Sequence, residues 1–425
     1  MIAKSLLMSL LACAMLTSTA CKKSVLEPAM ETQLLNKPDL NAIPAGQSIE
    51  PQIPTMAFVG VIQSETTLAR FEEMRAAGIT HCYSVFSDAN ALEKAMDIAL
   101  KANIKMFVMC PELKTDPERT VKRFMNHGAL AGYYLGDEPS SILFSSLKTW
   151  VNRIKALDSK HPCYVNLLPN YVTNKDLGTS SYQEYVKQFI DQVPVQLVSF
   201  DNYPIIGSTN LSVRERWYEN LETISSEARK AEKPFWAFAL TVAHGPYPVP
   251  TLAALRLQVF TNLAYGAQGI QFFSYWTIND PGGYNFNNAP IALDGTKTKV
   301  YYDLQAITAE IKSLSGVFLG AKLLSVAHTG TVIPLGTKRL TALPAVISVL
   351  KTEGIGAVVS ILERNNEAFL VVVNRDFTKS MKLTIKCASV VNRVSKDGSS
   401  APVSGKTENI TVAPGDVTVF KWIKT

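Results

Sequence analysis

Residues 130–157 read LAGYYLGDEPSSILFSSLKTWVNRIKAL, an apolar run followed by an amphipathic helical pattern. The run over Leu130–Leu135 is typical of a buried strand, whereas Ser146–Leu157 repeats its apolar side chains at helical spacing. A short segment with two adjacent acidic residues and a proline joins them. This stretch therefore predicts a strand and a helix that covers it.

The same order, strand and then helix, recurs on both sides of this stretch. Eight apolar runs predict strands at Met56–Ile62, Ile79–Phe86, Ile104–Cys110, Leu130–Leu135, Cys163–Leu168, Val195–Phe200, Phe235–Leu240 and Gly269–Tyr275. Helical patterns lie between them at Thr67–Ala77, Ala91–Ala102, Thr120–Met125, Ser146–Leu157, Tyr182–Ile190, Val213–Ala231 and Leu252–Ala264. Alternating strands and helices form a parallel sheet covered by helices. Eight such units over roughly 225 residues fit a (β/α)8 TIM barrel.

A doubly wound open sheet is the alternative architecture for this alternation. Such a sheet that binds nucleotides carries a glycine-rich turn after its first strand. Here that turn reads Gln63-Ser64-Glu65-Thr66 and has no glycine. The barrel is therefore the expected α/β fold.

The pattern changes after a last helix at Asp303–Ser313. Short strand signals follow at Ala357–Leu362, Phe369–Asn374, Lys382–Lys386, Val390–Val394 and Val417–Ile423. Turn signals such as Asp397-Gly398 and Pro414-Gly415-Asp416 separate them. They predict a C-terminal antiparallel β-sandwich of about 100 residues. We expect a barrel over residues 56–322 and a sandwich without catalytic residues over residues 323–425.

The first twenty residues have the features of an export signal. A positive Lys4 precedes a short apolar core that ends near Leu16 and is too short to span a membrane. Ala20-Cys21 resembles the cleavage site of bacterial lipoproteins, although Leu16 lies further from the cysteine than is usual there. We expect residues 1–20 to be the signal, Cys21 to be acylated, and the proline-containing residues 21–55 to be a tether. The resemblance implies a protein of the bacterial cell envelope, lipid-anchored and facing the periplasm or the cell surface. An ordinary secretory signal is the alternative.

Composition excludes several classes of function. Hydrophobic residues make up 47% of the 425 residues and charged residues 18%, which excludes a disordered chain. A net charge of +6, without a block of like charges, does not indicate a nucleic-acid partner. The six cysteines show no metal-ligand spacing, and the sequence has no serine elbow, HExxH or P-loop motif. We expect no metal and no cofactor.

The carboxyl ends of the predicted strands supply the candidate site, because active sites of TIM barrels lie there. The candidates at these ends are Glu112, Asp137, Glu138, Asn166, Asp201, Tyr203, His244, Tyr275 and Trp276. Gly136-Asp137-Glu138-Pro139, after the fourth strand, is the sharpest motif. A carboxylic acid there can protonate a glycosidic oxygen, which leaves poorly as an alkoxide. In the other interpretation the motif only starts a helix, with Glu138 as its cap and Pro139 as its first residue.

Three motifs in this order resemble barrel glycoside hydrolases. They are Gly136-Asp137-Glu138-Pro139, Ser199-Phe200-Asp201-Asn202-Tyr203-Pro204, and residues 263–270 (LAYGAQGI) leading into Phe273-Ser274-Tyr275-Trp276. The third resembles family 42 β-galactosidases and agarase-like barrels, and residues 412–420 (VAPGDVTVF) resemble their C-terminal β domain. The resemblance implies a carbohydrate substrate, Glu138 as general acid/base, and Trp276 as a floor on which a sugar stacks. Alternatively, Trp276 is a core aromatic. Tyr203 would either hydrogen-bond near the reaction centre or simply end a strand before Pro204. Tyr275, Asn166, His244 and Glu112 are further substrate-binding candidates.

One departure from that resemblance leaves the mechanism open. Retaining enzymes of this group carry a nucleophilic Glu after the seventh strand, but Phe235–His244 contains no carboxylate. Asp201 could supply the second carboxylate. Alternatively, Asp137 and Glu138 resemble the Asp–Glu pair of family 20 and family 123 hexosaminidases, in which the substrate's acetamido group is the nucleophile. In a third alternative the chain is a glycan-binding lipoprotein without catalysis.

Overall fold

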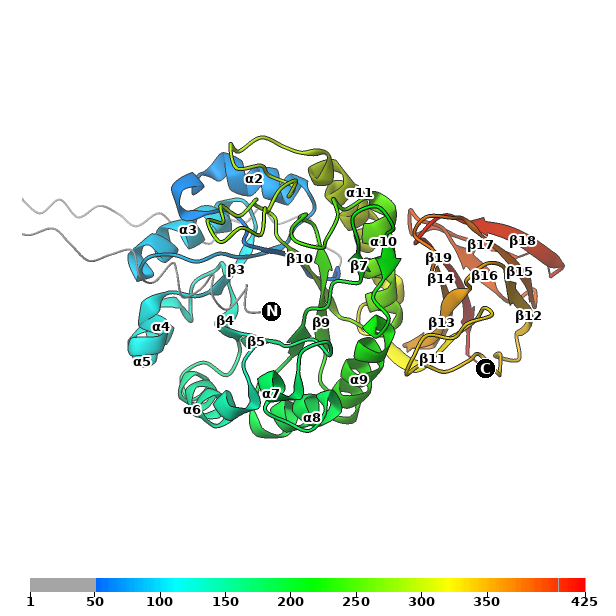
Figure 1. Ribbon diagram of the computed structural model, residues 1–425, viewed down its shortest axis with the longest axis horizontal. Helices are drawn as coiled ribbons and strands as arrows, with labels where there is room; N and C mark the ends of the chain where they lie inside the picture. Colours follow the sequence, from blue (N-terminus) through cyan, green and yellow to red (C-terminus); the bar gives the residue numbers. More distant parts are fainter. Residues whose placement is uncertain (1–50, 404, 425) are drawn as a thin grey trace, which may run out of the picture. The chain divides into compact units, whose positions relative to one another are not determined.

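The computed structural model describes residues 51–403 and 405–424. The predictions for the signal, for Cys21 and for most of the tether lie outside these residues. Eight parallel strands close into a barrel in the order β1-β10-β9-β6-β5-β4-β3-β2, with helices around them (Figure 1). The strands are β1 (Thr55–Phe58), β2 (His81–Tyr83), β3 (Lys105–Val108), β4 (Leu130–Asp137), β5 (Cys163–Leu167), β6 (Val198–Phe200), β9 (Phe235–Leu240) and β10 (Gly269–Phe273). The predicted TIM barrel is confirmed, and the open-sheet alternative is wrong.

The outer helices follow the amphipathic patterns of the sequence. They are α2 (Leu68–Ala76), α3 (Ala89–Lys101), α4 (Pro111–Thr115), α5 (Pro117–Phe124), α6 (Phe144–Lys155), α7 (Asn174–Leu177), α8 (Tyr182–Gln192), α9 (Trp217–Lys230), α10 (Leu252–Ala264), α11 (Lys299–Ser313) and α12 (Ser315–Phe318). Local caps fix several starts: the side chains of Thr67, Asp88 and Thr251 accept hydrogen bonds from the first turns of α2, α3 and α10. In the described part of the chain, no helix combines the length and apolarity needed to cross a membrane.

Two of the segments whose bounds differ from the prediction show why such differences arise. The predicted strand Met56–Ile62 ends at Phe58, and a 3-10 turn follows at Gln63–Glu65. The predicted helix Val213–Ala231 begins only at Trp217, because Ser212–Val213 (β8) pairs with Ile205–Ile206 (β7) in a small hairpin. In both cases a continuous apolar pattern hides a turn that tertiary contacts impose.

Aromatic side chains fill the interior of the barrel. The rings of Phe58 and Tyr83 lie 4.4 Å apart between centroids, and those of Tyr83 and Tyr134 lie 4.2 Å apart. Below them, the ring of Trp236 packs edge-on against Phe107 at 5.9 Å. This packing closes the barrel as a solid core, so any site must lie at its ends.

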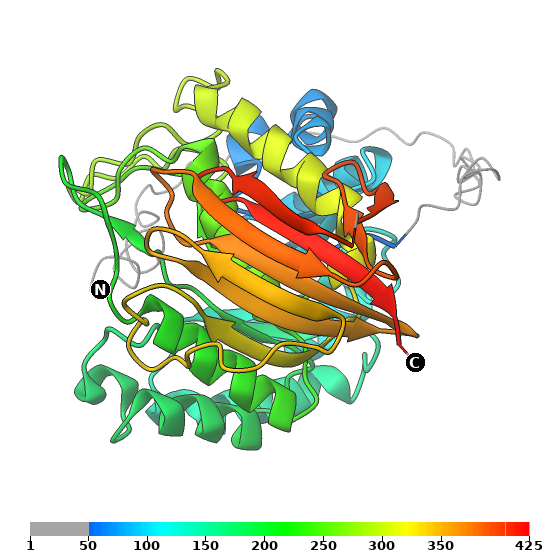
Figure 2. The same cartoon turned by 90° about the vertical axis from the view of Figure 1, so that its right-hand side faces the viewer.

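The C-terminal part is a β-sandwich of two antiparallel sheets. The larger has the order β11-β13-β14-β19-β16-β17 and the smaller the order β12-β15-β18. The strands are β11 (Lys322–His328), β12 (Ile347–Thr352), β13 (Ala357–Arg364), β14 (Glu367–Asn374), β15 (Met381–Cys387), β16 (Asn392–Val394), β17 (Ser400–Pro402), β18 (Thr407–Val412) and β19 (Val417–Ile423). Figure 2 shows the larger sheet in front of the barrel helices. The predicted sandwich is confirmed.

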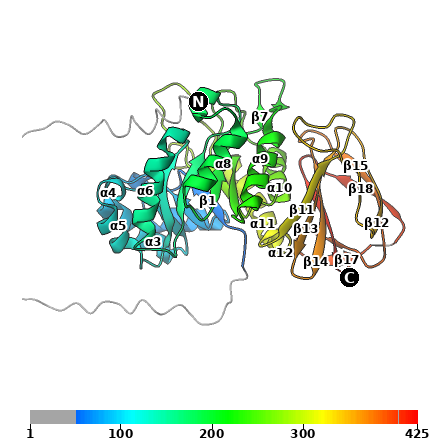
Figure 3. The same ribbon diagram turned by 90° about the horizontal axis from the view of Figure 1, so that it is seen from below.

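Alternation along β14 joins the sandwich to the barrel. Val371 belongs to the barrel core, whereas its neighbours Leu370 and Val372 face the interior of the sandwich. The larger sheet packs on α10, and Figure 3 shows α10, α11 and α12 between the two parts. The sandwich therefore packs against and supports the side of the barrel opposite β4.

Candidate active site

One buried amide connects two of the predicted carboxylates. Asn166, on β5, is fully buried. Its Nδ2 donates to Asp137 Oδ1 at 3.1 Å and to Asp201 Oδ1 at 2.9 Å. Since both oxygens bond one nitrogen, they lie no more than about 6 Å apart, in the range of paired carboxylates in glycosidases. The ends of β4, β5 and β6 thus meet at one point.

A deeper hydrogen-bond network holds this amide in place. Ser199 Oγ donates to Asn166 Oδ1 at 3.0 Å, and Gln271 Nε2 donates to Ser199 Oγ at 2.9 Å. Tyr164 OH donates to Gln271 Oε1 at 2.6 Å. The network reaches from β10 across the barrel interior to β5, so the orientation of Asn166 is fixed by the fold rather than by a flexible loop.

Glu138 follows directly and has an unusual backbone conformation. Its φ is +49°, in the left-handed region that non-glycine residues rarely adopt. Its N–H donates to Asn166 O at 2.8 Å, which continues the β4–β5 ladder. The helix-start interpretation is wrong, because α6 begins only at Phe144, after a 3-10 turn at Ser141–Leu143. The backbone of Glu138 is therefore strained, and the hydrogen bond to Asn166 stabilises it. Such backbone strain often occurs at functional sites.

The tyrosines of the barrel interior lie within the electrostatic reach of these carboxylates. Burial raises the pKa of Tyr83 and of Tyr134 well above the usual value, and the negative charge of Asp137 raises both further. Glu138 also raises the pKa of Tyr134. Asp201 is 1% exposed, whereas Asp137 and Glu138 are half-buried. Asp137 and Glu138 are therefore the carboxylates that a ligand reaches more easily.

Three predicted residues lie apart from this group. Glu112 Oε1 accepts a hydrogen bond from the Ala89 N–H at 3.1 Å and so caps α3. Tyr275 is fully buried behind the barrel wall, in the core that the helices share. Trp276 is 2% exposed, and the Arg70 guanidinium lies 5.2 Å from its ring centroid. Stacking of a sugar on Trp276 stays a prediction, and its burial gives no support to it.

Four of five half-buried residues near the mouth were missed by the sequence analysis. Five residues form what we call the rim: Tyr171, Arg214, His244, Tyr247 and Phe286. His244 stacks on Phe286 at 4.5 Å, and the Arg214 guanidinium lies 4.1 Å from the Tyr171 ring centroid. All five lie in loops without helical or strand periodicity, and His244 is the one that was predicted. Their only signal was their position shortly after strand ends.

Tyr203 connects the rim to the barrel interior. Its ring stacks on Phe273 of β10 at 5.8 Å and meets Tyr247 edge-on at 5.6 Å. His244 also contacts the Phe273 ring, at 5.9 Å. The structure therefore brings Tyr203 and His244 together around Phe273, at the C-terminal end of the barrel.

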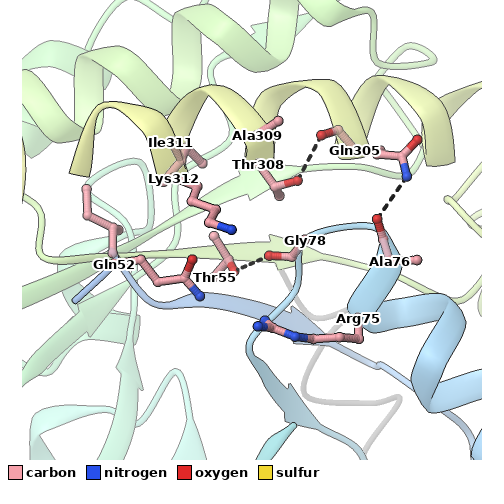
Figure 4. Close-up of a pocket in the computed structure, with 11 residues that line it drawn as sticks. Gln52, Thr55, Arg75, Ala76, Gly78, Gln305, Thr308, Ala309, Ile311 and Lys312 are labelled. Atoms are coloured by element: carbon pink, nitrogen blue, oxygen red, sulfur yellow. Dashed lines mark hydrogen bonds between the residues drawn. The ribbon is translucent and has the colours of Figure 1, made fainter. Parts of the chain in front are cut away.

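A cavity of about 270 Å³ opens at the opposite, N-terminal end of the barrel (Figure 4). Arg75, Lys312 and Gln52 line it, and Thr55 Oγ1 donates to Gly78 O at its wall. Basic residues here lie in the last turns of α2 and α11, where they offset the helix dipoles. The cavity is remote from the carboxylates, so we assign it no part in the site.

The described residues contain no candidate metal site. No group of three or more His, Cys, Asp or Glu side chains could hold an ion there. Cys82, Cys110, Cys163 and Cys387 are buried free thiols, and burial raises the pKa of Cys82 to about 11. These cysteines are therefore packed as small apolar side chains.

Comparison of the sequence with protein-family models and with curated proteins finds no match. The fold matches solved structures. A β-galactosidase from Bacillus circulans sp. alkalophilus is 10% identical, with a TM-score of 0.59, over 88% of this chain and 99% of that one. A GH42 β-galactosidase from G. stearothermophilus is 8% identical, with a TM-score of 0.56, over 88% and 98%. An α-amylase from Geobacillus thermoleovorans, complexed with acarbose, is 9% identical, with a TM-score of 0.53, over 88% and 98%.

The matches differ in how much of each protein they include. The chain spans 60% of the length of a β-galactosidase from the psychrophilic Marinomonas ef1. At these identities the likeness establishes the shared fold of barrel and sandwich.

Proposed function

We propose that the protein is a glycoside hydrolase with its active site at the carboxyl ends of β4, β5 and β6. The observation that carries this proposal is the Asn166 amide, which holds Asp137 and Asp201 together beside Glu138. Hydrolysis of a glycosidic bond uses an acid and a second group that stabilises the oxocarbenium-like transition state. The glycosidases among the matched structures support a glycoside hydrolase in general.

Glu138 is the general acid in this proposal. General acid catalysis is worth typically 10²–10⁴-fold, so Glu138→Gln should lower kcat by about that factor on a glycan with a poor leaving group. On an activated nitrophenyl glycoside, departure of the leaving group needs little protonation, so the loss at that step should be much smaller. Equal losses on both substrates, or full activity on the glycan, would remove Glu138 from this role.

Asp137 is the better supported partner of Glu138, because it is half-buried whereas Asp201 is 1% exposed. An Asp next to the acid can orient the substrate's own acetamido group, which makes 2-acetamido sugars the proposed substrates. Asp137→Asn should then be nearly as damaging as Glu138→Gln. If Asp201→Asn is the more damaging change and sugars without an acetamido group are cleaved, Asp201 supplies the second carboxylate instead.

A glycan-binding protein without catalysis is the competing function. A screen of the purified protein against nitrophenyl glycosides, N-acetylated ones included, separates the two. Turnover that is lost in Glu138→Gln supports the enzyme. Binding of glycans with no turnover on any of them supports the binding protein.

We also propose that Cys21 carries a lipid that anchors the protein in the bacterial cell envelope. The support is the sequence pattern before Ala20-Cys21. Cells that express the full-length chain or its Cys21→Ser variant are fractionated into membrane and soluble parts. Loss of membrane association in the variant is expected, and identical partitioning of both forms would contradict the anchor.

A further inference from the structure

Arg214 holds its guanidinium group in a fixed place at the mouth of the barrel. It follows the β7–β8 hairpin, and its backbone N–H donates to Pro204 O at 2.7 Å. The guanidinium carbon lies 4.1 Å from the Tyr171 ring centroid and 5.9 Å from that of Tyr247. Nη2 donates to Tyr247 OH at 3.1 Å. Tyr171 follows β5 and Tyr247 follows β9, so Arg214 lies across the end of β6, the strand that leads into Asp201.

Among the described residues, the positive charge of Arg214 has no carboxylate counter-ion. In the described residues, no carboxylate lies within ion-pair distance of it, whereas Arg216, two positions on, pairs with Glu219. Guanidinium groups carry five N–H donors in a planar fork. For Arg214 the protein supplies acceptors through Tyr203 O, at 3.5 Å, and Tyr247 OH. A half-buried cation with donors to spare is expected to meet an anion.

We propose that Arg214 binds the carboxylate of an acidic sugar, a uronate, in the glycan that the active site accepts. A carboxylate matches the planar fork with two parallel hydrogen bonds, and the neighbouring aromatic rings can cover the apolar face of a sugar. Arg214 Nε donates to Tyr203 O, two residues after Asp201, so this subsite lies at the same end of the barrel as the carboxylates. The inference rests on the proposed function for the kind of ligand, and it deepens that function by naming the substrate class as acidic glycans.

Binding without turnover tests this subsite separately from catalysis. The Glu138→Gln protein is titrated by calorimetry with a hyaluronan tetrasaccharide and with tetragalacturonate, each beside its carboxyl-reduced counterpart. The reduced probes keep the sugars and linkages but replace each carboxylate with a neutral hydroxymethyl group. We expect the acidic member of at least one pair to bind 10-fold or more tightly than its reduced form, with an affinity that falls as salt rises.

Variants on the same background assign that preference to Arg214. Arg214→Gln should reduce the preference to about 2-fold or less, and Arg214→Lys should retain part of it, because a lysine keeps the charge and loses the fork. Arg216→Gln is the matched control, since it removes a nearby exposed arginine that is already paired. It should leave the preference unchanged. Melting temperatures of all variants show whether each is folded.

Three results would overturn the proposal. One is equal affinity for acidic and reduced probes, and another is a preference that survives Arg214→Gln in a folded protein. The third is binding of a sulfated neutral oligosaccharide but of neither uronate. Absence of turnover on every glycan, combined with an Arg214-dependent preference for uronates, would contradict the proposed hydrolase and leave the acidic subsite standing.

Discussion

Replacement of Asn166 by Asp tests the central link of the candidate site with almost no change in shape. The amide donates to Asp137 and Asp201 at 3.1 and 2.9 Å. An ionised carboxylate at the same position has no proton to donate and adds a third negative charge. Hydrogen bonds to charged groups contribute about 1.5–3 kcal/mol each, so loss of both should lower the free energy of unfolding at pH 7 by roughly 3–6 kcal/mol.

The pH dependence of this loss identifies its cause. Repulsion by Asp137 and Asp201 raises the pKa of the introduced carboxyl above its unfolded value. Once protonated, the carboxyl can donate again, so the variant regains stability as the pH falls through the folded pKa. One extra bound proton corresponds to a slope of about 1.4 kcal/mol per pH unit. The stability difference between wild type and variant should therefore shrink from pH 7 to pH 5.

Urea unfolding of the wild type and of two variants measures this effect. Asn170→Asp is the matched control, because Asn170 is also buried and lies after the same strand, but its amide donates to the carbonyl of Arg216. The control should show a smaller narrowing of the gap at lower pH, because burial raises the pKa of its carboxyl as well. Its hydrogen-bond partners, the Arg216 carbonyl, Asn202 and Asn220, carry no negative charge that would raise that pKa further. If both variants show the same loss and the same pH profile, Asn166 does not bridge the two carboxylates and the geometry of the site is wrong.

Three further predictions concern packing and the barrel–sandwich junction. Gly132→Ala should cost about 1–3 kcal/mol in urea unfolding, because its Cβ would lie 2.4 Å from Pro162 O, whereas Gly136→Ala, with open space around it, should cost under about 0.5 kcal/mol. Burial, with Arg375 nearby, lowers the pKa of His328 to about 3. The unfolded chain therefore takes up a proton first, and stability falls between pH 6.5 and pH 3 by up to about 1.4 kcal/mol per pH unit; His328→Gln should flatten that fall. Asp416→Asn breaks an ion-pair cluster with Lys396, Arg256 and Glu310, so it should lower the melting temperature and leave KM and kcat unchanged.

Periodicity predicted the barrel because its strands are buried on both faces and most of its helices on one. Helix α10, packed between the barrel and the sandwich, is instead buried on nearly all sides. Phe235–Leu240 and Leu252–Ala264 have the bounds that the sequence indicated. Strand ends were harder to predict, since an apolar run can continue into a loop that is also buried, as at Val59–Ile62. Short edge strands of the sandwich, such as Ser400–Pro402, show little alternation of apolar and polar residues. They can be assigned only from the strand with which they pair in the structure.

The candidate site was predicted in part, for a reason that follows from barrel geometry. The rule that chemistry lies at strand ends placed Asp137, Asn166 and Asp201 at one edge, and their hydrogen bonds agree with it. The rule says nothing about which way a side chain turns after the strand ends. Trp276 and Tyr275 follow β10 and yet turn into the protein core. Loop residues such as Arg214 face the mouth through contacts between distant loops.

The carboxylates with Asn166 and the residues of the rim are held at the mouth by different elements. Asp137, Asn166 and Asp201 are held by strand ends and by a network that crosses the barrel, so their spacing is as rigid as the core. The rim is held by ring contacts between loops, which can change in evolution without disturbing the barrel. A reaction centre on the strands and a recognition surface on the loops would let the sugar specificity vary while the chemistry stays the same. Arg214→Gln should accordingly change which glycan binds, whereas Asn166→Asp should damage the site for every glycan.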